Sequence, residues 1–294
     1  MPTFPLETLA VAIRDRLGPC PEDALLPTVS VVVPNRDGVD CLRRLLSGLS
    51  ARTDYPALEL IVVDNGSSDG SLDFIESAPA SFPISALANA RNDSFSDACN
   101  QGAGSAAGEL LLFLNNDVEP FEPGWLRELV ACLQGSGAGA VGATLLCSEE
   151  EHERSFAHGY GVQHRGHLFV TGRDGTTEPV LRGWEADPLD KGLGDDAECE
   201  SVAASCLLVE NRTFREIGGF SPGYFYGCED VDLCLKLRAA GLKIVCAGRS
   251  VLIHHPATTR RAIPFEQARA IKLANHRLLH KRWGPGLTPD SKRL

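Results

Sequence analysis

Apolar residues in the first half of the chain alternate between short continuous runs and segments with helical spacing. The run Val29–Val33 is β-branched, and further apolar runs cover residues 58–63, 84–87 and 110–114. Such runs are typical of strands that are buried on both faces of a parallel sheet. The segments between them, residues 39–51, 71–76 and 95–107, have the spacing or composition of helices. This alternation predicts an α/β fold, with a doubly wound, mostly parallel central sheet and flanking helices.

Polar clusters follow three of the expected strands. They are Asn35-Arg36-Asp37, Asp64-Asn65 and Asn115-Asn116-Asp117. In open α/β sheets ligands bind at the carboxyl ends of the strands. Each cluster alone is equally typical of a polar turn, but three of them at one edge of a sheet favour a binding site.

The pattern is less regular between residues 148 and 200, where Gly, His, Asp and Glu are frequent. Loops of this length are usually functional or disordered, so we expect an excursion over the site with short strand-like pieces, such as residues 167–170. Regular patterns then return. Strands are expected at 202–209, 243–247 and 251–253, and helices at 212–217 and 229–240.

Composition narrows the functional classes. The chain has 294 residues and a formal net charge of −11, which argues against nucleic-acid binding because that requires a basic surface. Its ten cysteines are scattered and form no CxxC pair, which favours reduced thiols in a cytoplasmic protein. The N-terminus lacks a signal-peptide pattern, and no window reaches the roughly 20 apolar residues of a membrane span. A soluble or peripheral protein is therefore expected.

The C-terminal segment, residues 262–283, has the pattern of a basic amphipathic helix. Such a helix can lie on an anionic membrane surface, which would bring the protein to the inner face of the membrane. A helix that packs on the domain and keeps a solvated basic face explains the same pattern, so both interpretations stay open.

Several motifs occur in a characteristic order along the chain. They are VSVVVPNRD (29–37), IVVDNGSSDGS (61–71), the segment 92–102, LFLNNDV (112–118), IGGF (217–220), CEDVDLCLKL (228–237) and His254-His255. With them the chain resembles the family 2 glycosyltransferases of GT-A fold, and most closely the rhamnosyltransferase-type members that assemble bacterial surface polysaccharides. The resemblance extends over about residues 28–260.

The resemblance implies a site for a nucleoside-diphosphate sugar. Asp64 would accept a hydrogen bond from the base, although capping of its own turn is an equally suitable role for this carboxylate. Asn100 would start or brace the helix behind the diphosphate, and the equal alternative is a plain helix residue. Arg36 would stack on the base. The full implied set is Pro34, Asn35, Arg36, Asp37, Asp64, Asn92, Asn100, Asn115 and Asn116.

The triplet Asn115-Asn116-Asp117 corresponds to the acidic metal motif of the family, usually written DxD. The resemblance implies that Asp117 and His254 hold Mg²⁺ or Mn²⁺, and an imidazole ligand suits Mn²⁺ better. The chain departs from the motif at Asn115, which leaves Asp117 as the only charged residue of the triplet. A structural role is the alternative for His254.

Glu229-Asp230 corresponds to the ED motif, in which the aspartate acts as the general base for the acceptor hydroxyl. Both residues are catalytic candidates, and Asp230 is the stronger one. The alternative is that Glu229, Asp230 and Asp232 occupy the first turn of a helix, where the helix dipole favours carboxylates.

The resemblance implies inverting transfer from a UDP- or dTDP-linked sugar, with rhamnose as one candidate, to a hydroxyl of a glycan or lipid-linked acceptor. The expected organisation is an N-terminal extension (1–27), a single GT-A domain (28–260) and a C-terminal helix and tail (261–294). Residues 28–147 would form the nucleotide-binding half and residues 148–260 the acceptor half.

Other functions fit the sequence less well. A non-catalytic nucleotide-sugar or carbohydrate-binding module would explain Asn115 but not the intact Glu229-Asp230 pair. A sugar nucleotidyltransferase would need a glycine-rich, basic loop after the first strand, and a dehydrogenase would need GxGxxG there. Residues 34–40 have neither pattern.

Overall fold

The computed structural model describes residues 26–148, 161–172, 175–181, 194–255, 264–284 and 287. Most of the expected N-terminal extension (1–27) and the chain beyond residue 287 lie outside this part. So do residues 149–160 and 182–193, which make up much of the expected excursion.

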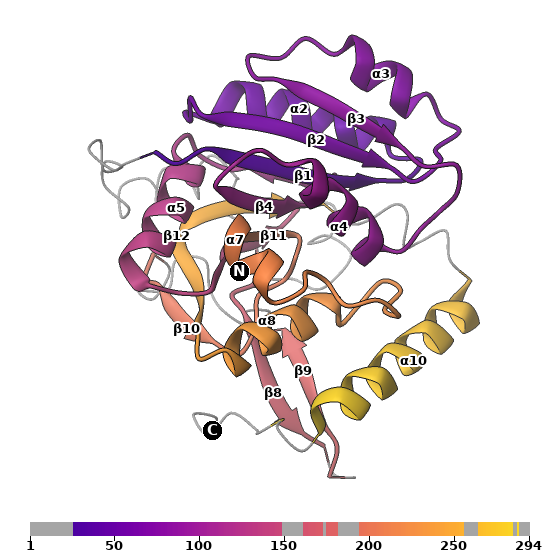
Figure 1. Cartoon of the computed structure of the whole chain (residues 1–294), viewed down its shortest axis with the longest axis vertical. Helices are drawn as coiled ribbons and strands as arrows, with labels where there is room; N and C mark the ends of the chain where they lie inside the picture. Colours follow the sequence, from indigo (N-terminus) through magenta and orange to yellow (C-terminus); the bar gives the residue numbers. More distant parts are fainter. Residues whose placement is uncertain are drawn as a thin grey trace, which may run out of the picture.

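One mixed sheet forms the centre of the molecule, in the order β10-β12-β6-β11-β4-β1-β2-β3 (Figure 1). Strands β3, β2, β1 and β4 are parallel, whereas β11 pairs antiparallel with both β4 and β6. The short strand β5 pairs with β12, and β7 pairs with β6. The main strands are β1 (Val29–Asn35), β2 (Leu58–Asp64), β3 (Ile84–Ala88), β4 (Leu110–Leu114), β5 (Val118–Pro120), β6 (Ala140–Cys147), β7 (Val162–His164), β10 (Ala197–Cys199), β11 (Cys206–Glu210) and β12 (Ile244–His254).

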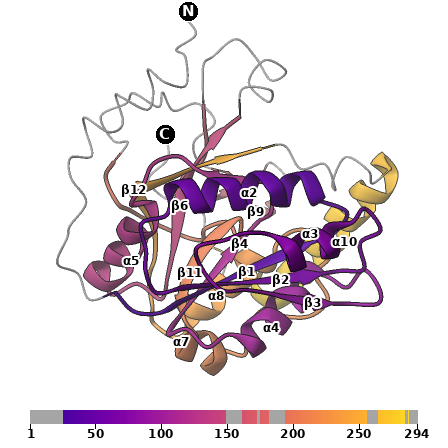
Figure 2. The same ribbon diagram turned by 90° about the horizontal axis from the view of Figure 1, so that it is seen from above.

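Helices cover both faces of this sheet, as Figure 2 shows for α2 and α4. The alternation of side chains along β1 gives the reason: Val31 and Val33 belong to the core on the side of α2, α3 and α5, and Val32 belongs to the core on the side of α4, α7 and α8. The helices are α2 (Val39–Arg52), α3 (Ser71–Ser77), α4 (Phe95–Ser105), α5 (Trp125–Ser136), α7 (Asn211–Glu216), α8 (Glu229–Ala239) and α10 (Phe265–Trp283).

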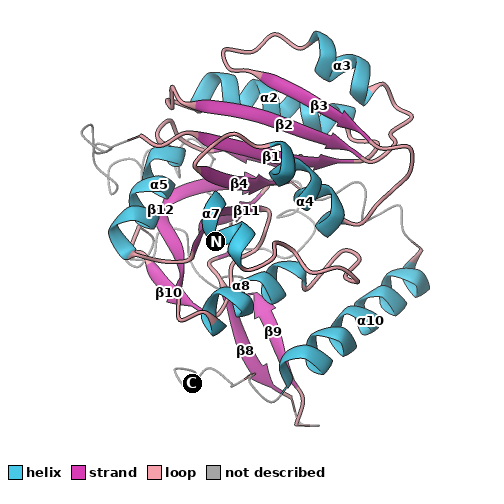
Figure 3. Cartoon of the chain, in the orientation of Figure 1, coloured by secondary structure: helices cyan, strands magenta, loops and turns pink. Residues whose placement is uncertain are grey.

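Beyond strand β4 the chain is more regular than its sequence pattern indicated. Helix α5 and strand β6, which the pattern did not predict, continue the main fold. Within the expected excursion, β7 and β10 join the main sheet, and β8 (His167–Thr171) pairs with β9 (Thr177–Leu181) as a separate hairpin (Figure 3). The two strands expected at 243–247 and 251–253 form the single strand β12, which has a register shift between Ala247 and Val251.

Helix α10 packs against the acceptor half through its polar as well as its apolar residues. The buried amide of Asn275 accepts a hydrogen bond from the backbone N of Phe225 (3.2 Å) and donates to its carbonyl (2.9 Å). The buried Asp232 carboxylate of α8 accepts from Arg282 (3.1 Å) and Trp283 (2.9 Å) at the end of α10. Burial alone would raise the pKa of Asp232, but hydrogen bonds from Ser221, Trp283 and Arg282 lower it on balance.

No helix in the described ranges is long and apolar enough to cross a membrane. The region described therefore offers no candidate for a membrane span.

Two glycines of α4 provide a test of how closely this helix approaches the sheet. A Cβ atom at Gly102 would overlap Val32 of β1, whereas a Cβ at Gly104 would meet no atom within 4 Å. Gly104→Ala is expected to stabilise the protein by up to about 1 kcal/mol, because alanine favours the helix. Gly102→Ala is expected to destabilise it by about 1–3 kcal/mol through overpacking, measured by denaturant unfolding. An equal gain for both variants would contradict this packing.

Candidate active site

The three polar clusters predicted to share one sheet edge do lie together, and Asn35 connects them. Its amide donates to the Asp64 carboxylate (2.9 Å) and accepts from Asn116 Nδ2 (2.7 Å). Asn35 is 2% exposed, so the ends of β1, β2 and β4 are joined by one buried side chain. The expectation that these clusters form one polar edge is therefore confirmed.

Gly38, which the sequence analysis did not select, makes this junction possible. A Cβ atom at this position would overlap Asn116 Nδ2 and would lie 2.7 Å from Asn35 Oδ1. Any side chain at residue 38 would thus disrupt the hydrogen bond between the β1 and β4 loops. In the sequence this glycine could have been recognised by its position, directly after the cluster Asn35-Arg36-Asp37 and directly before helix α2.

Asp64 has the local role of capping its turn. Its carboxylate accepts from the backbone N of Ser67 (2.8 Å), from Ser67 Oγ (2.6 Å) and from Asn35 (2.9 Å). Asp64 is 1% exposed, so these three contacts account for its carboxylate in this structure. Contact with a nucleotide base stays a prediction.

The next two predicted residues are also held by the loops around them. Arg36 Nη1 donates to the carbonyls of Asn65 and Gly66, both at 2.5 Å. The Asp37 carboxylate pairs with Arg36 Nε (2.9 Å) and accepts from the backbone N of Ser68 (2.7 Å). These contacts fix the loop after β1 against the loop after β2. Pro34 itself lies within β1, opposite Val63 of β2. Base stacking by Arg36 is not tested by these contacts.

Asp117 and His254 form the candidate metal pair, with Asp117 Oδ1 3.1 Å from His254 Nε2. His254 Nδ1 lies 2.6 Å from Gln163 Oε1, a contact in which Nδ1 donates, so the ring is held with Nε2 toward Asp117. The 3.1 Å contact between Nε2 and Oδ1 is favourable when a proton or a cation lies between the two atoms. Gln163 therefore orients His254 in the way that outer hydrogen bonds orient metal-bound histidines.

This pair fits a hard divalent ion only in part. The described residues contain no group of three or more His, Cys, Asp or Glu side chains that could hold a metal. One carboxylate and one imidazole leave several coordination positions for substrate oxygens and water, as is usual for Mg²⁺ and Mn²⁺ in phosphate chemistry. The donor set is therefore compatible with an ion that binds together with a diphosphate.

The ED motif begins α8, but its two carboxylates face different neighbours. Glu229 is 8% exposed and accepts from the backbone N of Gly227 (2.6 Å), so it stabilises the turn before the helix. Asp230 is less buried and accepts from the backbone N of Val231 (2.8 Å) and Ala204 (3.3 Å). Asp230 is thus the carboxylate of the two that is more available to a substrate.

Residues 203–205 bring the metal triplet and the ED motif together. The strand expected from residue 202 begins only at Cys206, because the backbone before it bonds to side chains. Ala204 N donates to Asp230, and Ser205 accepts from the Asn115 backbone N (3.1 Å) and faces the Asn115 amide (Oγ to Nδ2, 3.4 Å). Asn115 therefore fastens the triplet to this segment instead of supplying a carboxylate.

Two buried histidines, His164 and His167, support the same segment. His164 Nε2 accepts from the backbone N of Ala203 (3.0 Å), and His167 Nδ1 lies 2.9 Å from Ser201 Oγ. Burial and the neighbouring His167 and His254 hold the pKa of His164 well below its usual value. Burial also lowers the pKa of His167, against an opposing effect of the Asp230 charge. Both are thus neutral bracing groups close to the ED motif.

The remaining two predicted residues lie on the α4 side. Both polar atoms of the Asn100 amide bond to Phe220, one to its backbone N and one to its carbonyl, each at 2.9 Å. Asn100 therefore braces α4 against the segment before the ED motif, and its role behind a diphosphate stays a prediction. Asn92 is exposed and is hydrogen-bonded to the side chain of Tyr226.

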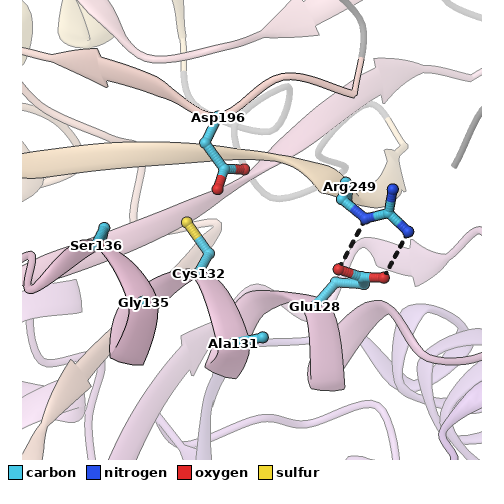
Figure 4. A pocket seen from close by; sticks show the side chains of 7 residues that line it. All are labelled: Glu128, Ala131, Cys132, Gly135, Ser136, Asp196 and Arg249. Atoms are coloured by element: carbon cyan, nitrogen blue, oxygen red, sulfur yellow. Dashed lines mark hydrogen bonds and ion pairs between the residues drawn. The ribbon is translucent and has the colours of Figure 1, made fainter. Parts of the chain in front are cut away.

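A separate cavity of about 290 Å³ lies between α5 and strand β12 (Figure 4). Its charged side chains have partners within the protein. Arg249 pairs with Glu128 through two contacts of 3.0 Å, and Asp196 accepts a hydrogen bond from the backbone N of Gly248 (3.0 Å). None of the predicted site residues lines it. It is not the candidate active site.

Comparison with known proteins identifies related sequences. A model of glycosyl transferase family 2 matches residues 30–183. O-antigen biosynthesis protein RfbC of Myxococcus xanthus is 34% identical over 245 residues, which are 82% of this chain and 18% of that protein. N-acetylglucosaminyl-diphospho-decaprenol L-rhamnosyltransferase of Mycobacterium tuberculosis is 28% identical over 232 residues, 74% of this chain and 72% of the relative. The chain spans less than a third of RfbC and, at 28%, of protein y4gI of Sinorhizobium fredii.

Solved structures show the fold. GalNAc-T7 with UDP, GalNAc and Mn²⁺ superposes with a TM-score of 0.62 at 20% identity, over 79% of this chain and 44% of that chain. Mannosyltransferase PcManGT from Pyrobaculum calidifontis, in complex with GDP-Man and Mn²⁺, has a TM-score of 0.58 at 17% identity, over 94% and 73% of the two chains. The expected GT-A fold is confirmed. Because the family model matches 154 of the 294 residues (30–183), the chain belongs to glycosyl transferase family 2.

Proposed function

We propose that the protein is an inverting glycosyltransferase. It moves a sugar from a nucleoside-diphosphate donor to a hydroxyl of a glycan or lipid-linked acceptor. The proposal rests on the closeness of the ED motif and the triplet Asn115-Asn116-Asp117. Asp230 of the first bonds to Ala204, and Asn115 of the second bonds to the neighbouring residue Ser205. A base for the acceptor and a site for the donor diphosphate are needed side by side in such a reaction.

In this reaction the acceptor oxygen attacks the anomeric carbon from the side opposite the diphosphate. The carbon–oxygen bond to the diphosphate breaks, and the nucleoside diphosphate leaves with the bonding electron pair. Asp230 takes the proton of the acceptor hydroxyl, a contribution of about 10²–10⁴-fold in rate for a positioned base. One displacement inverts the configuration at the anomeric carbon. Glu229 keeps the turn before Asp230 in place through Gly227.

Asp117 and His254 would hold the divalent ion, Mg²⁺ or Mn²⁺. When bound, such an ion neutralises the negative charge of the departing diphosphate. The closeness of the two side chains, 3.1 Å between Oδ1 and Nε2, supports this assignment. The structures of GalNAc-T7 and PcManGT, both with Mn²⁺, support it as well.

The donor is proposed to be a UDP- or dTDP-linked sugar, with rhamnose as the first sugar to try. The rhamnosyltransferase name of the Mycobacterium tuberculosis relative favours that sugar, and its diphospho-decaprenol acceptor favours a lipid-linked one. The name of RfbC favours a role in surface polysaccharide assembly. Residues Asp64, Asn92 and Arg36 would contact the nucleotide.

We also propose a peripheral contact with the membrane through α10. This helix carries five Lys or Arg residues and one Glu within a chain of net charge −11. Phe265 is 77% exposed and Leu273 is 48% exposed, so both lie on the outward face of α10. Exposed apolar residues beside cationic ones match the headgroup region of an anionic bilayer.

Substitution of the proposed base separates binding from chemistry. Asp230→Asn is expected to reduce transfer at least 100-fold, because an amide cannot accept the acceptor proton, while the Kd for the donor stays within about twofold. Transfer is measured as release of nucleoside diphosphate with the acceptor that the wild type uses. Asp73→Asn, the same change in the exposed first turn of α3, is the control and should retain full activity. Full transfer by the Asp230 variant would refute the base assignment.

Vesicle sedimentation tests the membrane contact. The protein is expected to sediment with phosphatidylglycerol-containing vesicles, and to do so less with pure phosphatidylcholine vesicles or at high salt. Arg269→Glu on α10 should weaken sedimentation several-fold. Arg212→Glu, the same charge reversal at an exposed position of α7, should leave it unchanged. Equal sedimentation of both variants would exclude α10 as the docking face.

A further inference from the structure

Three successive residues before the ED motif have left-handed backbone conformations. Their φ angles are +56° at Tyr226, +138° at Gly227 and +69° at Cys228. For residues other than glycine this conformation costs on the order of 1–3 kcal/mol each, and it persists only where the surrounding structure imposes it. Tyrosine is a bulky residue for such a position, so its presence calls for a reason.

Contacts on both sides of this turn hold it in place. Asn275 of α10 binds both the backbone N and the carbonyl of Phe225, at 3.2 and 2.9 Å. On the other side, Glu229 accepts from Gly227 N at 2.6 Å. The turn is therefore clamped between α10 and the first residue of α8, and the direction of the Tyr226 side chain is fixed by its backbone.

The Tyr226 side chain reaches from the acceptor half to the nucleotide-binding half. Its hydroxyl is hydrogen-bonded to the side chain of Asn92, and it lies within electrostatic range of Arg36 and Glu229. Its ring packs edge-on against Phe225, with ring centroids 4.7 Å apart. Burial raises the pKa of Tyr226, so the phenol is neutral and acts as a hydrogen-bonding group.

The neighbours of Tyr226 place it at the base end of the candidate site. Asn92 precedes Asp93, whose carbonyl accepts from Asn65 Nδ2 (2.9 Å), and Asn65 directly follows Asp64. Arg36 binds the carbonyl of the same Asn65. Asn92 and Arg36 thus both belong to the loops around Asp64. The candidate metal pair lies elsewhere, because Asp117 follows β4 and His254 is the last residue of β12.

We infer that Tyr226 contacts the nucleoside of the donor, so that a residue of the acceptor half closes over the nucleotide and its strained turn keeps the ring in that position. This inference rests on the proposed function. An aromatic ring and a hydroxyl on one side chain suit a nucleoside, because the ring can pack on the base or ribose while the hydroxyl forms a hydrogen bond.

Calorimetric titration of Tyr226 variants with the nucleoside diphosphate that the wild type binds, UDP or dTDP, tests the inference. Tyr226→Ala is expected to raise the Kd about tenfold, by the same factor with and without Mn²⁺, because the contact is with the nucleoside and not with the ion. Tyr226→Phe retains the ring and should raise the Kd only about two- to threefold. Tyr226→Gly removes both the contact and the backbone strain, so its Kd should match that of Tyr226→Ala while its melting temperature is at least as high.

The outcomes are distinct. One outcome is that the wild type binds nucleoside diphosphate and that Tyr226→Ala and Tyr226→Gly bind it with the wild-type Kd. Tyr226 then has a structural role only, and the inference fails while the proposed function stands. A loss confined to the Mn²⁺-containing titration would move Tyr226 to the metal end and would also overturn the inference. If the wild type binds neither UDP nor dTDP under either condition, the proposed function fails, and this inference fails with it.

Discussion

The candidate site depends on a short backbone segment, residues 203–205, that is prevented from continuing strand β11. Its N–H groups bond to side chains: Ala203 to His164 and Ala204 to Asp230. Its last member, Ser205, binds Asn115 at the start of the metal triplet. A buried N–H or carbonyl group must be paired, so these contacts fix the ED motif relative to the triplet as firmly as a strand pairing would.

Two asparagines extend this constraint to the segment that leads into the ED motif. Asn100 from α4 binds the backbone of Phe220, and Asn275 from α10 binds the backbone of Phe225. The segment between them is thereby attached to both the nucleotide-binding half and the C-terminal helix. Because Asp232 also binds Arg282 and Trp283, α10 directly supports helix α8, which carries the ED motif. A helix that presents cationic and apolar side chains outward is thus also part of the support of the site.

The nucleotide-binding half of the fold could be predicted from the sequence because its signals are local. Continuous apolar runs such as Val29–Val33 identify strands buried on both faces, and the polar residues after them identify the binding edge. The chain beyond strand β4 was less accessible. Helix α5 and strand β6 were not predicted, and residues 202–205 were expected to be a strand although their backbone bonds to side chains distant in sequence. The roles of Gln163, His164 and Gly38 likewise depend on partners that only the folded chain brings close.

The substitution at Asn115 is understandable in these terms. An amide at this position can donate to Ser205 where a carboxylate cannot, and the distance between Asn115 Nδ2 and Ser205 Oγ is 3.4 Å. The charge needed to hold a divalent ion then falls to Asp117, with His254 oriented beside it by Gln163. The account therefore predicts that the donor diphosphate supplies part of the coordination, and that ion and donor bind together.

Calorimetric titration of UDP and dTDP into the wild-type protein and into Asp117→Ala, each with and without Mn²⁺, tests this claim most directly. The account predicts that Mn²⁺ strengthens binding of one of the two nucleotides to the wild type by at least tenfold, and that Asp117→Ala removes this gain while weak metal-independent binding remains. Binding that is unaffected by Mn²⁺ in the wild type, or an equal gain in both proteins, would contradict it.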